Sequence, residues 1–310
     1  MKILYIQPVH EAGMRRLAEH HVVCVAPDTR RETLLACVRD ADAIVTRLTR
    51  VDAKLMAAAP RLKAVCKHGV GVDNIDVEYA RTRGIAVLTT GDANSATVAE
   101  HAMIAIGALM KRTVHMDAAT RRGDWGARDC GTSVDLAGKT LGLVGYGRIG
   151  SRLARMAWQG FDMHVAVFDP YVSAEDVRAN GCEWVPALNE LLARADVLSV
   201  HVPLTEETRG MLGREQFLCM RPGSYVVNFA RGGIVDETAL ADLLACGHIA
   251  GAAIDVFAQE PPEGSPLLHA PNALLSPHCA TFTEDSRRRM SLRLAEEIEK
   301  IFSSHGMIVQ

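Results

Sequence analysis

The sequence contains no long apolar run. Its longest apolar helical stretch, residues 99–110, is interrupted by His101 and followed directly by Lys111 and Arg112, so it is too short to span a bilayer. The N-terminal apolar run is only as long as a strand and lacks the small-residue cleavage site of a signal peptide. We therefore expect a cytoplasmic protein with no membrane partner.

The chain also lacks an excess of either charge. It has 34 Lys and Arg against 37 Asp and Glu, a formal net charge of −3, so no basic face for nucleic acid is expected. The eight cysteines form no C-x-x-C pair and mostly lie in apolar runs, which predicts reduced thiols. The histidines other than His278 do not show the spacing of metal ligands, so no metal is predicted.

What the sequence does contain is an alternation of strand-like and helix-like segments. The expected strands include 2–6, 22–26, 43–46, 62–66 and 86–88, and further along 197–202, 225–229, 251–256 and 274–276. A long helix is expected from Thr97 to Arg122, and a last helix over 284–302. With 310 residues, enough for about two cores, the pattern predicts an α/β protein with two parallel-sheet domains.

The segment 140–150 is central to this pattern. It is an apolar strand that leads into a G-x-G-x-x-G turn formed by Gly145, Gly147 and Gly150. In a dinucleotide-binding fold the first glycine allows the tight turn, the second lets the backbone approach a pyrophosphate, and the third lets the next helix pack on the strand. The N–H groups at the start of that helix then point at the phosphates.

A second strand ends at Asp169, about 20 residues beyond the glycines, where this fold places a carboxylate for the adenosine ribose hydroxyls. Asp169 is followed by Pro170 and Tyr171 rather than by arginine. A 2′-phosphate would be repelled by the carboxylate, so the sequence favours NAD over NADP.

Several further motifs lie at the ends of expected strands. They are H-G-V-G-V-D-N-I-D at 68–76, V-A-E-H at 98–101, H-V-P-L-T at 201–205 with Thr208, N-F-A-R-G at 228–232, A-I-D-V-F at 253–257, E-P at 260–261 and S-P-H at 276–278. Together with the glycine turn and Asp169, they resemble the D-isomer-specific 2-hydroxyacid dehydrogenase family over nearly the whole chain. Within it, the sequence is most similar to the short 3-phosphoglycerate dehydrogenases.

This resemblance implies a domain organisation that composition does not show. A Rossmann NAD-binding domain, residues 99–282, would be inserted into a flavodoxin-like substrate-binding domain made of residues 1–98 and 283–310. The resemblance also implies a homodimer joined through the cofactor domains and the long helix, for which the apolar stretch 99–110 is suitable.

Three residues suit the reduction or oxidation of a 2-oxo or 2-hydroxy acid. Arg231 is permanently charged and can hold the substrate carboxylate through two hydrogen bonds. His278 can donate and accept a proton near neutral pH, and Glu260 would orient its ring. Each of the three also fits an ordinary turn, but their order and their positions at strand ends favour a catalytic triad.

The same resemblance implies the cofactor contacts. They are Gly145, Gly147, Arg148, Ile149 and Gly150 at the pyrophosphate, Asp169, Val202, Pro203 and Thr208 beside adenosine and phosphate, and Phe229, Ala230, Arg231, Asp255, His278 and Ala280 around the nicotinamide. Asp255 would bind the carboxamide. Phe229 is bulkier than the residue expected at its position.

Substrate contacts are expected in the first domain. The turn Gly69, Val70 and Gly71 would present backbone N–H groups to the substrate carboxylate, with help from Asn94 at the domain junction. Arg231 and His278 complete the expected substrate contacts. Three cations near strand ends suggest a second anionic group on the substrate, to which Arg128 would add; the alternative is that they are solvated surface charges. These cations are Arg47, Arg50 and Lys67.

The sequence therefore predicts an NAD-dependent D-2-hydroxyacid dehydrogenase for a small, doubly anionic acid. The leading substrate is 3-phosphoglycerate, as in serine biosynthesis. The alternatives within the class are hydroxypyruvate or glyoxylate reduction and the oxidation of sulfolactate or phosphite, whereas formate oxidation is disfavoured because Glu260 stands where those enzymes carry an amide. An alternative from another class is an NAD(H)-sensing co-regulator that binds protein partners.

Overall fold

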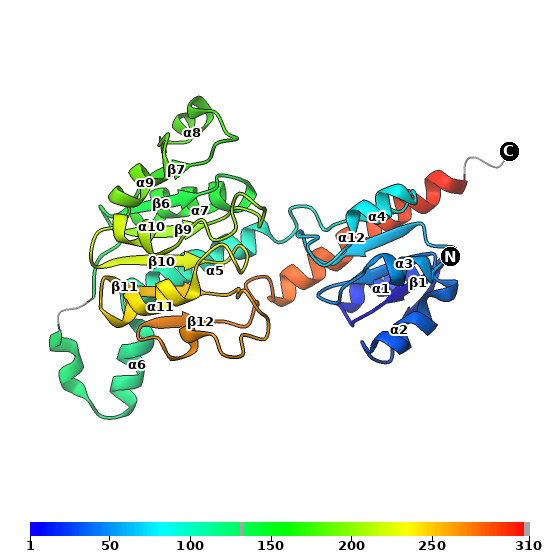
Figure 1. Ribbon diagram of the computed structural model, residues 1–310, viewed down its shortest axis with the longest axis horizontal. Helices are drawn as coiled ribbons and strands as arrows, with labels where there is room; N and C mark the ends of the chain where they lie inside the picture. Colours follow the sequence, from blue (N-terminus) through cyan, green and yellow to red (C-terminus); the bar gives the residue numbers. More distant parts are fainter. Residues whose placement is uncertain (131–132, 307–310) are drawn as a thin grey trace. The chain divides into compact units, whose positions relative to one another are not determined.

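The computed structural model describes residues 1–130 and 133–306 (Figure 1). The chain divides into two compact units: Met1–Asn94 with Thr281–Gln310, called the first unit, and Ser95–Ala280, called the second unit. The boundaries expected from sequence, 98/99 and 282/283, lie a few residues later in the chain. The end of the expected first domain, 307–310, and the side chain of Cys130 lie outside the described residues.

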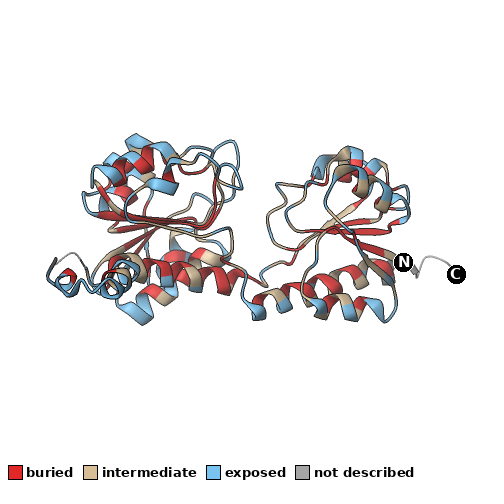
Figure 2. Ribbon diagram, turned by 90° about the horizontal axis from the view of Figure 1, so that it is seen from below, coloured by how far each residue is buried: buried red, intermediate tan, exposed pale blue. Residues whose placement is uncertain are grey.

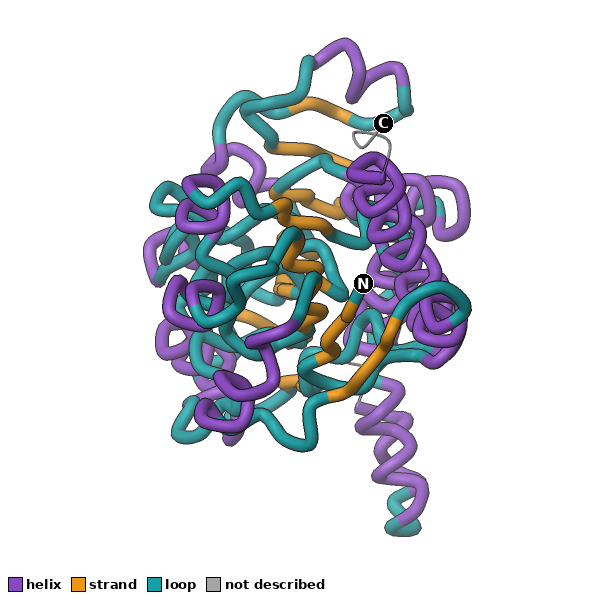
Figure 3. The backbone as a smooth tube through the Cα atoms, turned by 90° about the vertical axis from the view of Figure 1, so that its right-hand side faces the viewer, coloured by secondary structure: helices purple, strands orange, loops and turns teal. Residues whose placement is uncertain are grey.

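The first unit contains a sheet of five parallel strands in the order β2-β1-β3-β4-β5. This is the 2-1-3-4-5 order of flavodoxin-like folds. The strands are β1 Lys2–Tyr5, β2 Val22–Val25, β3 Ala43–Thr46, β4 Ala64–Lys67 and β5 Ala86–Leu88. The three inner strands are almost entirely buried because helices cover both faces of the sheet (Figure 3).

The helices of the first unit are α1 Glu11–Ala18, α2 Arg31–Cys37, α3 Ala53–Ala57, α4 Val77–Thr82 and α12 Glu284–Gly306, with the 3₁₀ turn Val38–Asp40. Helix α12 packs on the sheet through Leu294 and Ile298, which share a core with Ile3. It also crosses α1 so closely that a Cβ on Gly13 would lie 2.2 Å from the Ser291 carbonyl oxygen. The last helix therefore belongs to the first unit.

The second unit contains seven parallel strands in the order β12-β11-β10-β9-β6-β7-β8. The strands are β6 Thr140–Val144, β7 His164–Phe168, β8 Glu183–Trp184, β9 Val197–Val200, β10 Ser224–Asn228, β11 Ile249–Ile254 and β12 Ala273–Leu275. Read from β8, this is the doubly wound dinucleotide-binding order with one added strand, and its switch point lies between β6 and β9. The predicted α/β class with two parallel sheets is confirmed.

The helices of the second unit cover both faces of this sheet, and buried residues concentrate on the strands and the inner helix faces (Figure 2). They are α5 Ser95–Met110, α6 Thr113–Arg121, α7 Arg148–Phe161, α8 Ala174–Ala179, α9 Leu188–Arg194, α10 Arg214–Cys219 and α11 Glu237–Ala245, with 3₁₀ turns at Trp125–Cys130 and Pro266–His269. Among the described residues, no helix has the length and apolarity that a membrane span requires.

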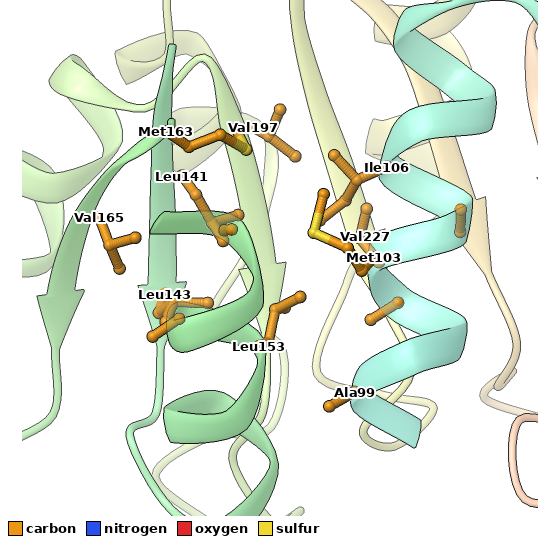
Figure 4. Packing of buried hydrophobic residues seen from close by; sticks show 14 of the residues in the cluster. Ala99, Met103, Ile106, Leu141, Leu143, Leu153, Met163, Val165, Val197 and Val227 are labelled. Carbon is orange, nitrogen blue, oxygen red and sulfur yellow. The ribbon is translucent and has the colours of Figure 1, made fainter. Parts of the chain in front are cut away.

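The single long helix expected from Thr97 to Arg122 is wrong. The structure has two helices, because Arg112 adopts a left-handed backbone conformation with φ 53° that ends the first of them. Helix α5 supplies Ala99, Met103 and Ile106 to the main core, where they pack with Leu143 of β6 and Leu153 of α7 (Figure 4).

Candidate active site

The glycine turn connects β6 to α7 in the second unit. Gly145 has φ 99°, and a Cβ there would lie 2.8 Å from the carbonyl oxygen of His201. A Cβ on Gly150 would lie 2.2 Å from the Gly145 carbonyl oxygen, so helix and turn touch through backbone alone. At Gly147, the residue before α7, a Cβ would meet no atom within 4 Å. The turn thus leaves open space beside the first N–H groups of the helix, as a bound pyrophosphate requires.

Asp169 lies beside this turn, at the end of β7. Its Oδ2 accepts the backbone N–H of Tyr146 at 2.8 Å, and its Oδ1 accepts that of Tyr171 at 2.9 Å. The carboxylate is therefore fixed from both sides. It retains lone pairs for ribose hydroxyls, because each oxygen has accepted only one hydrogen bond.

The loop after β9 contains three of the expected cofactor contacts. Thr208 Oγ1 donates to the Pro203 carbonyl at 2.6 Å and accepts the Thr205 N–H at 2.8 Å, which fixes the loop next to Val202. Arg148 and Ile149 form the first turn of α7 across the switch point, as their sequence positions imply.

His201 was given no functional role by sequence reasoning, yet it supports the glycine turn. Its Nε2 bonds Ser199 Oγ at 2.9 Å, and its buried Nδ1 has no partner in the described part of the chain. Burial lowers the pKa of the ring to about 4, so the ring is neutral. The sequence signal for this packing was the apolar strand before His201, which is expected to end beside the glycine turn of the neighbouring strand.

Asn228 organises the loop after β10. Its Oδ1 accepts the Ala230 N–H at 3.1 Å, and its Nδ2 donates to the Arg231 carbonyl at 3.0 Å. The Arg231 guanidinium donates to the Ala230 carbonyl at 2.6 Å. The ring of Phe229 stacks edge-on with that of His101, the centroids lying 5.1 Å apart. The bulk of Phe229 is thus accommodated against helix α5.

Asp255 holds the loop that carries the catalytic histidine candidate. Asp255 is 1% exposed, and its carboxylate accepts hydrogen bonds from Ser276 Oγ at 2.6 Å, Cys279 N–H at 2.8 Å and Ala280 N–H at 3.0 Å. Its backbone carbonyl accepts the His278 N–H at 2.8 Å. The structure therefore shows Asp255 as the anchor of this loop, whereas a contact with a carboxamide stays a prediction.

Glu260 and His278 form a pair at this anchored loop. Glu260 Oε2 lies 2.8 Å from His278 Nδ1, and Oε1 accepts the Phe257 N–H at 3.2 Å. His278 has φ 50°, a left-handed conformation that the Asp255 network sustains. Burial alone would raise the pKa of Glu260, but its hydrogen bond and attraction to His278, with the nearby Arg231, lower it overall. The structure brings the three predicted catalytic residues together.

The predicted substrate residues of the first unit surround the ends of β3 and β4. Lys67 Nζ donates to the Arg47 carbonyl and to Asn74 Oδ1, both at 2.5 Å. The Arg47 guanidinium lies over the Phe282 ring, 4.8 Å from its centroid. Arg50 is exposed. Lys67 is therefore engaged within the protein.

The remaining predicted contacts have different environments. Gly69 has φ 150° and its carbonyl accepts the Thr90 N–H at 3.0 Å, which shapes the turn through Val70 and Gly71. Asn94 is 7% exposed, and its Oδ1 has no partner within residues 1–130 and 133–306.

Arg128 lies in the second unit, where it has local partners. Its guanidinium is over the Trp125 ring at 5.7 Å and 3.6 Å from the Asp129 carboxylate.

Residues 103–280 match the family model described as "D-isomer specific 2-hydroxyacid dehydrogenase, NAD binding domain". The chain belongs to the D-isomer-specific 2-hydroxyacid dehydrogenase family. Its NAD-binding domain is the second unit, and the strand order and glycine turn described above are the structural counterpart of that match.

Relatives within this family differ in name and length. The D-3-phosphoglycerate dehydrogenase of Methanocaldococcus jannaschii is 41% identical over 302 residues, which are 97% of this chain and 57% of the relative. The glyoxylate reductase of Korarchaeum cryptofilum is 38% identical, with 96% of this chain and 91% of the relative covered. The chain thus spans about half the length of the phosphoglycerate dehydrogenases it matches and nearly all of the glyoxylate reductase.

A solved structure has a similar fold over nearly the whole chain. The D-lactate dehydrogenase of Aquifex aeolicus, solved with NAD and lactic acid, is 28% identical with a TM-score of 0.88, covering 98% of this chain and 96% of that one.

Proposed function

We propose that this chain is an NAD-dependent oxidoreductase that moves a hydride between NAD and the hydroxyl-bearing carbon of a D-2-hydroxy acid. The observation that carries the proposal is the Glu260–His278 pair, with 2.8 Å between Oε2 and Nδ1, placed in the second unit with Arg231 nearby. An acid–base pair beside a fixed cation is the chemistry that carbonyl reduction and alcohol oxidation require.

The pair defines the proton route. With Nδ1 bound to Glu260, proton exchange with substrate falls to His278 Nε2. In oxidation, neutral His278 takes the proton of the hydroxyl group while a hydride leaves the carbon that bears this hydroxyl. In reduction, the imidazolium returns that proton to the carbonyl oxygen, and the Glu260 carboxylate stabilises its charge. Arg231 holds the substrate carboxylate through its guanidinium.

NAD, when bound, supplies the hydride acceptor or donor. The open space at Gly147 and the adjoining start of α7 fit its pyrophosphate. The doubly anchored Asp169 fits its ribose hydroxyls and would repel a 2′-phosphate. These residues support NAD rather than NADP.

For the substrate, 3-phosphoglycerate leads and glyoxylate or hydroxypyruvate is the alternative, in keeping with the names of the two relatives. The first unit would supply the anion-binding groups, namely the backbone of Gly69, Val70 and Gly71, Asn94 and the cation Arg47. We further place the enzyme in the cytoplasm and, for phosphoglycerate, in serine biosynthesis. Exposed apolar side chains on α5 and α6, Ile104 at 72% and Val114 at 60%, support a homodimer.

Initial rates test this function. Purified protein is given NAD with D-3-phosphoglycerate, D-glycerate, sulfolactate, D-lactate or phosphite, and NADH with hydroxypyruvate or glyoxylate. We expect turnover of a D-2-hydroxy acid, and none of its L-isomer. Tight NADH binding without turnover across the panel would instead favour a sensing role with protein partners.

A further inference from the structure

The carboxyl end of the first-unit sheet contains buried polar atoms that have no hydrogen-bond partner among the described residues. His68, directly after β4, is 6% exposed, and its Nε2 has no hydrogen-bond partner among the described residues. The Nε of Arg47, after β3, is likewise buried and unpartnered there. The Thr90 side chain is fully buried, and its hydroxyl has no partner within that same part of the chain. Thr90 is next to His68, because its backbone N–H bonds the carbonyl of Gly69.

A second arginine reaches this place from the start of α12. Arg287 is close enough to Arg47 and to His68 to lower the pKa of each, after the larger effect of burial. Its ion pair with Glu284 is long, 3.9 Å, and the Glu284 carboxylate also lies 2.8 Å from His10 Nε2. Two guanidinium groups and an imidazole therefore lie near one another, and the ion pair that Arg287 forms with Glu284 among the described residues is long and shared with His10.

Such an arrangement is unfavourable without an anion. Buried polar groups in proteins are nearly always hydrogen-bonded, and like charges in a desolvated place repel. The Arg47 guanidinium lies over the face of the Phe282 ring, and no ion pair joins it to a carboxylate among the described residues. An anion with several oxygens would satisfy Arg47 Nε and His68 Nε2 and remove the repulsion between the arginines.

The other two cations expected from sequence have different environments. Lys67 already bonds the Arg47 carbonyl and Asn74 Oδ1, so it positions the backbone of Arg47. Arg50 is exposed, and its charge acts on Asp52.

We propose that His68 and Arg287 join Arg47 in a subsite for a second anionic group of the substrate, a phosphate ester or a sulfonate, and that these two residues determine specificity for it. The proposal rests on the proposed function, since it assigns part of the same substrate. Donors from three separate segments suit a group with three oxygens better than a planar carboxylate. The two arginines supply charge.

His68 supplies direction. Burial, reinforced by Arg47 and Arg287, lowers the pKa of its ring to about 4, so it is neutral at pH 7. In the tautomer protonated at Nε2, the neutral ring donates one hydrogen bond in a fixed direction. It therefore favours the binding of a ligand that has an oxygen at that point.

Steady-state kinetics on the full chain test the subsite. The variants are His68→Ala and Arg287→Gln, with Arg83→Gln, at an exposed position of the first unit, as the matched control. The substrates are D-3-phosphoglycerate and sulfolactate, compared with D-glycerate and D-lactate. We expect each subsite variant to lower kcat/KM for the doubly anionic acids by about 10- to 100-fold, mainly through KM, and to change the singly charged acids less than about threefold. Arg83→Gln should leave kcat/KM unchanged for both groups of acids.

The comparison of D-3-phosphoglycerate with sulfolactate also distinguishes a phosphate ester from a sulfonate. A preference for phosphoglycerate or for sulfolactate, lost in both variants, identifies the group. Equal losses for singly and doubly charged acids, or no loss at all, would overturn the subsite while leaving the proposed function intact. Arg287→Gln, at a half-exposed position, provides the test if His68→Ala does not fold.

A binding measurement keeps the two proposals distinct. If no acid in the panel is oxidised, the proposed function fails, and thermal unfolding with inorganic phosphate or sulfate still tests the subsite. Stabilisation of the wild type that both variants lose supports an anion site, whereas equal stabilisation of all proteins, or none, rejects it.

Discussion

The carboxyl edges of the two sheets differ in how far they satisfy their own polar groups. In the second unit, the Asp255 carboxylate receives three donors, and Glu260 receives one on each oxygen. In the first unit, Arg47 Nε and His68 Nε2 are buried without partners in the described chain. His201 is an exception in the second unit. The network around Asp255 and Glu260 is complete before any ligand binds, whereas the first-unit edge leaves buried groups that a ligand can satisfy.

The difference corresponds to the two tasks that the proposed reaction sets. Proton transfer needs groups held in a fixed geometry, so a finished network favours the reaction. Binding of a polyanion needs donors that are not already bound to protein oxygens, because each bond to be broken would subtract from affinity. The second-unit edge can therefore be tested by removing the group that it positions and by loosening the network itself.

The largest effect is expected from removing the proton carrier. His278→Ala should lower kcat by about 10² to 10⁴-fold, because the hydrogen bonds to Asp255 remain but general acid–base catalysis is lost. NADH binding should remain, and it is measured by fluorescence titration beside the steady-state rates. The exposed His269→Ala is the control. Full activity in His278→Ala would show that another group moves the proton.

Loss of Asp169 should affect the cofactor alone. Asp169→Ala should raise KM for NAD by about 10- to 100-fold, because hydrogen bonds from the ribose to a charged acceptor are lost. Glu175→Ala, an exposed acid on α8, should change nothing. An equally large rise in KM for the hydroxy acid would mean that the substitution disturbs the fold rather than NAD binding alone.

Asp255 tests how much the complete network contributes to stability. Asp255→Asn puts an N–H₂ where a carboxylate oxygen meets donors, and should reduce the free energy of unfolding by about 1–3 kcal/mol. Urea unfolding measures this. The control is Asp117→Asn, which breaks an exposed ion pair with Arg121 and should change stability by less than about 0.5 kcal/mol. Similar values for both would mean that the loop tolerates the lost acceptor.

The smallest effect concerns pH. Burial raises the pKa of Glu260, but the His278 interaction outweighs it and holds the pKa below its usual value. The stabilisation is therefore complete above that usual value, about 4.3, and is lost as pH falls through the folded-state pKa. Between pH 7 and pH 3 the wild type should lose more unfolding free energy than Glu260→Gln, by less than about 1 kcal/mol since the pair is partly exposed. The measurement is urea unfolding of both proteins at both pH values. Equal losses of unfolding free energy in the wild type and Glu260→Gln would contradict this.

The fold class and the family could be predicted because they depend on local patterns. Gly145, Gly150 and Asp169 follow strands at fixed spacing, and the structure shows the backbone contacts that require the two glycines. The break at Arg112 could not be predicted, because a left-handed arginine carries no sequence signal comparable to a glycine or proline.

The individual site roles were harder to predict, since they depend on contacts between distant segments. Asp255 was expected at the cofactor, but its loop role appears only when β11 and residues 276–280 come together. Lys67 looked like a substrate cation, whereas the fold places Asn74 and the Arg47 carbonyl against it. His68 was part of a recognised motif, and only burial distinguishes its ring from a surface histidine.

The contact between α1 and α12 has a consequence for how the protein is made. The Gly13 N–H bonds Ser291 Oγ across a sequence separation of 278 residues, and the whole second unit lies between them. During synthesis the five strands of the first sheet leave the ribosome early, with the face that Leu294 and Ile298 will cover still exposed. The second unit is continuous and can fold as soon as it emerges. The unit that is translated first must therefore be the last to finish folding.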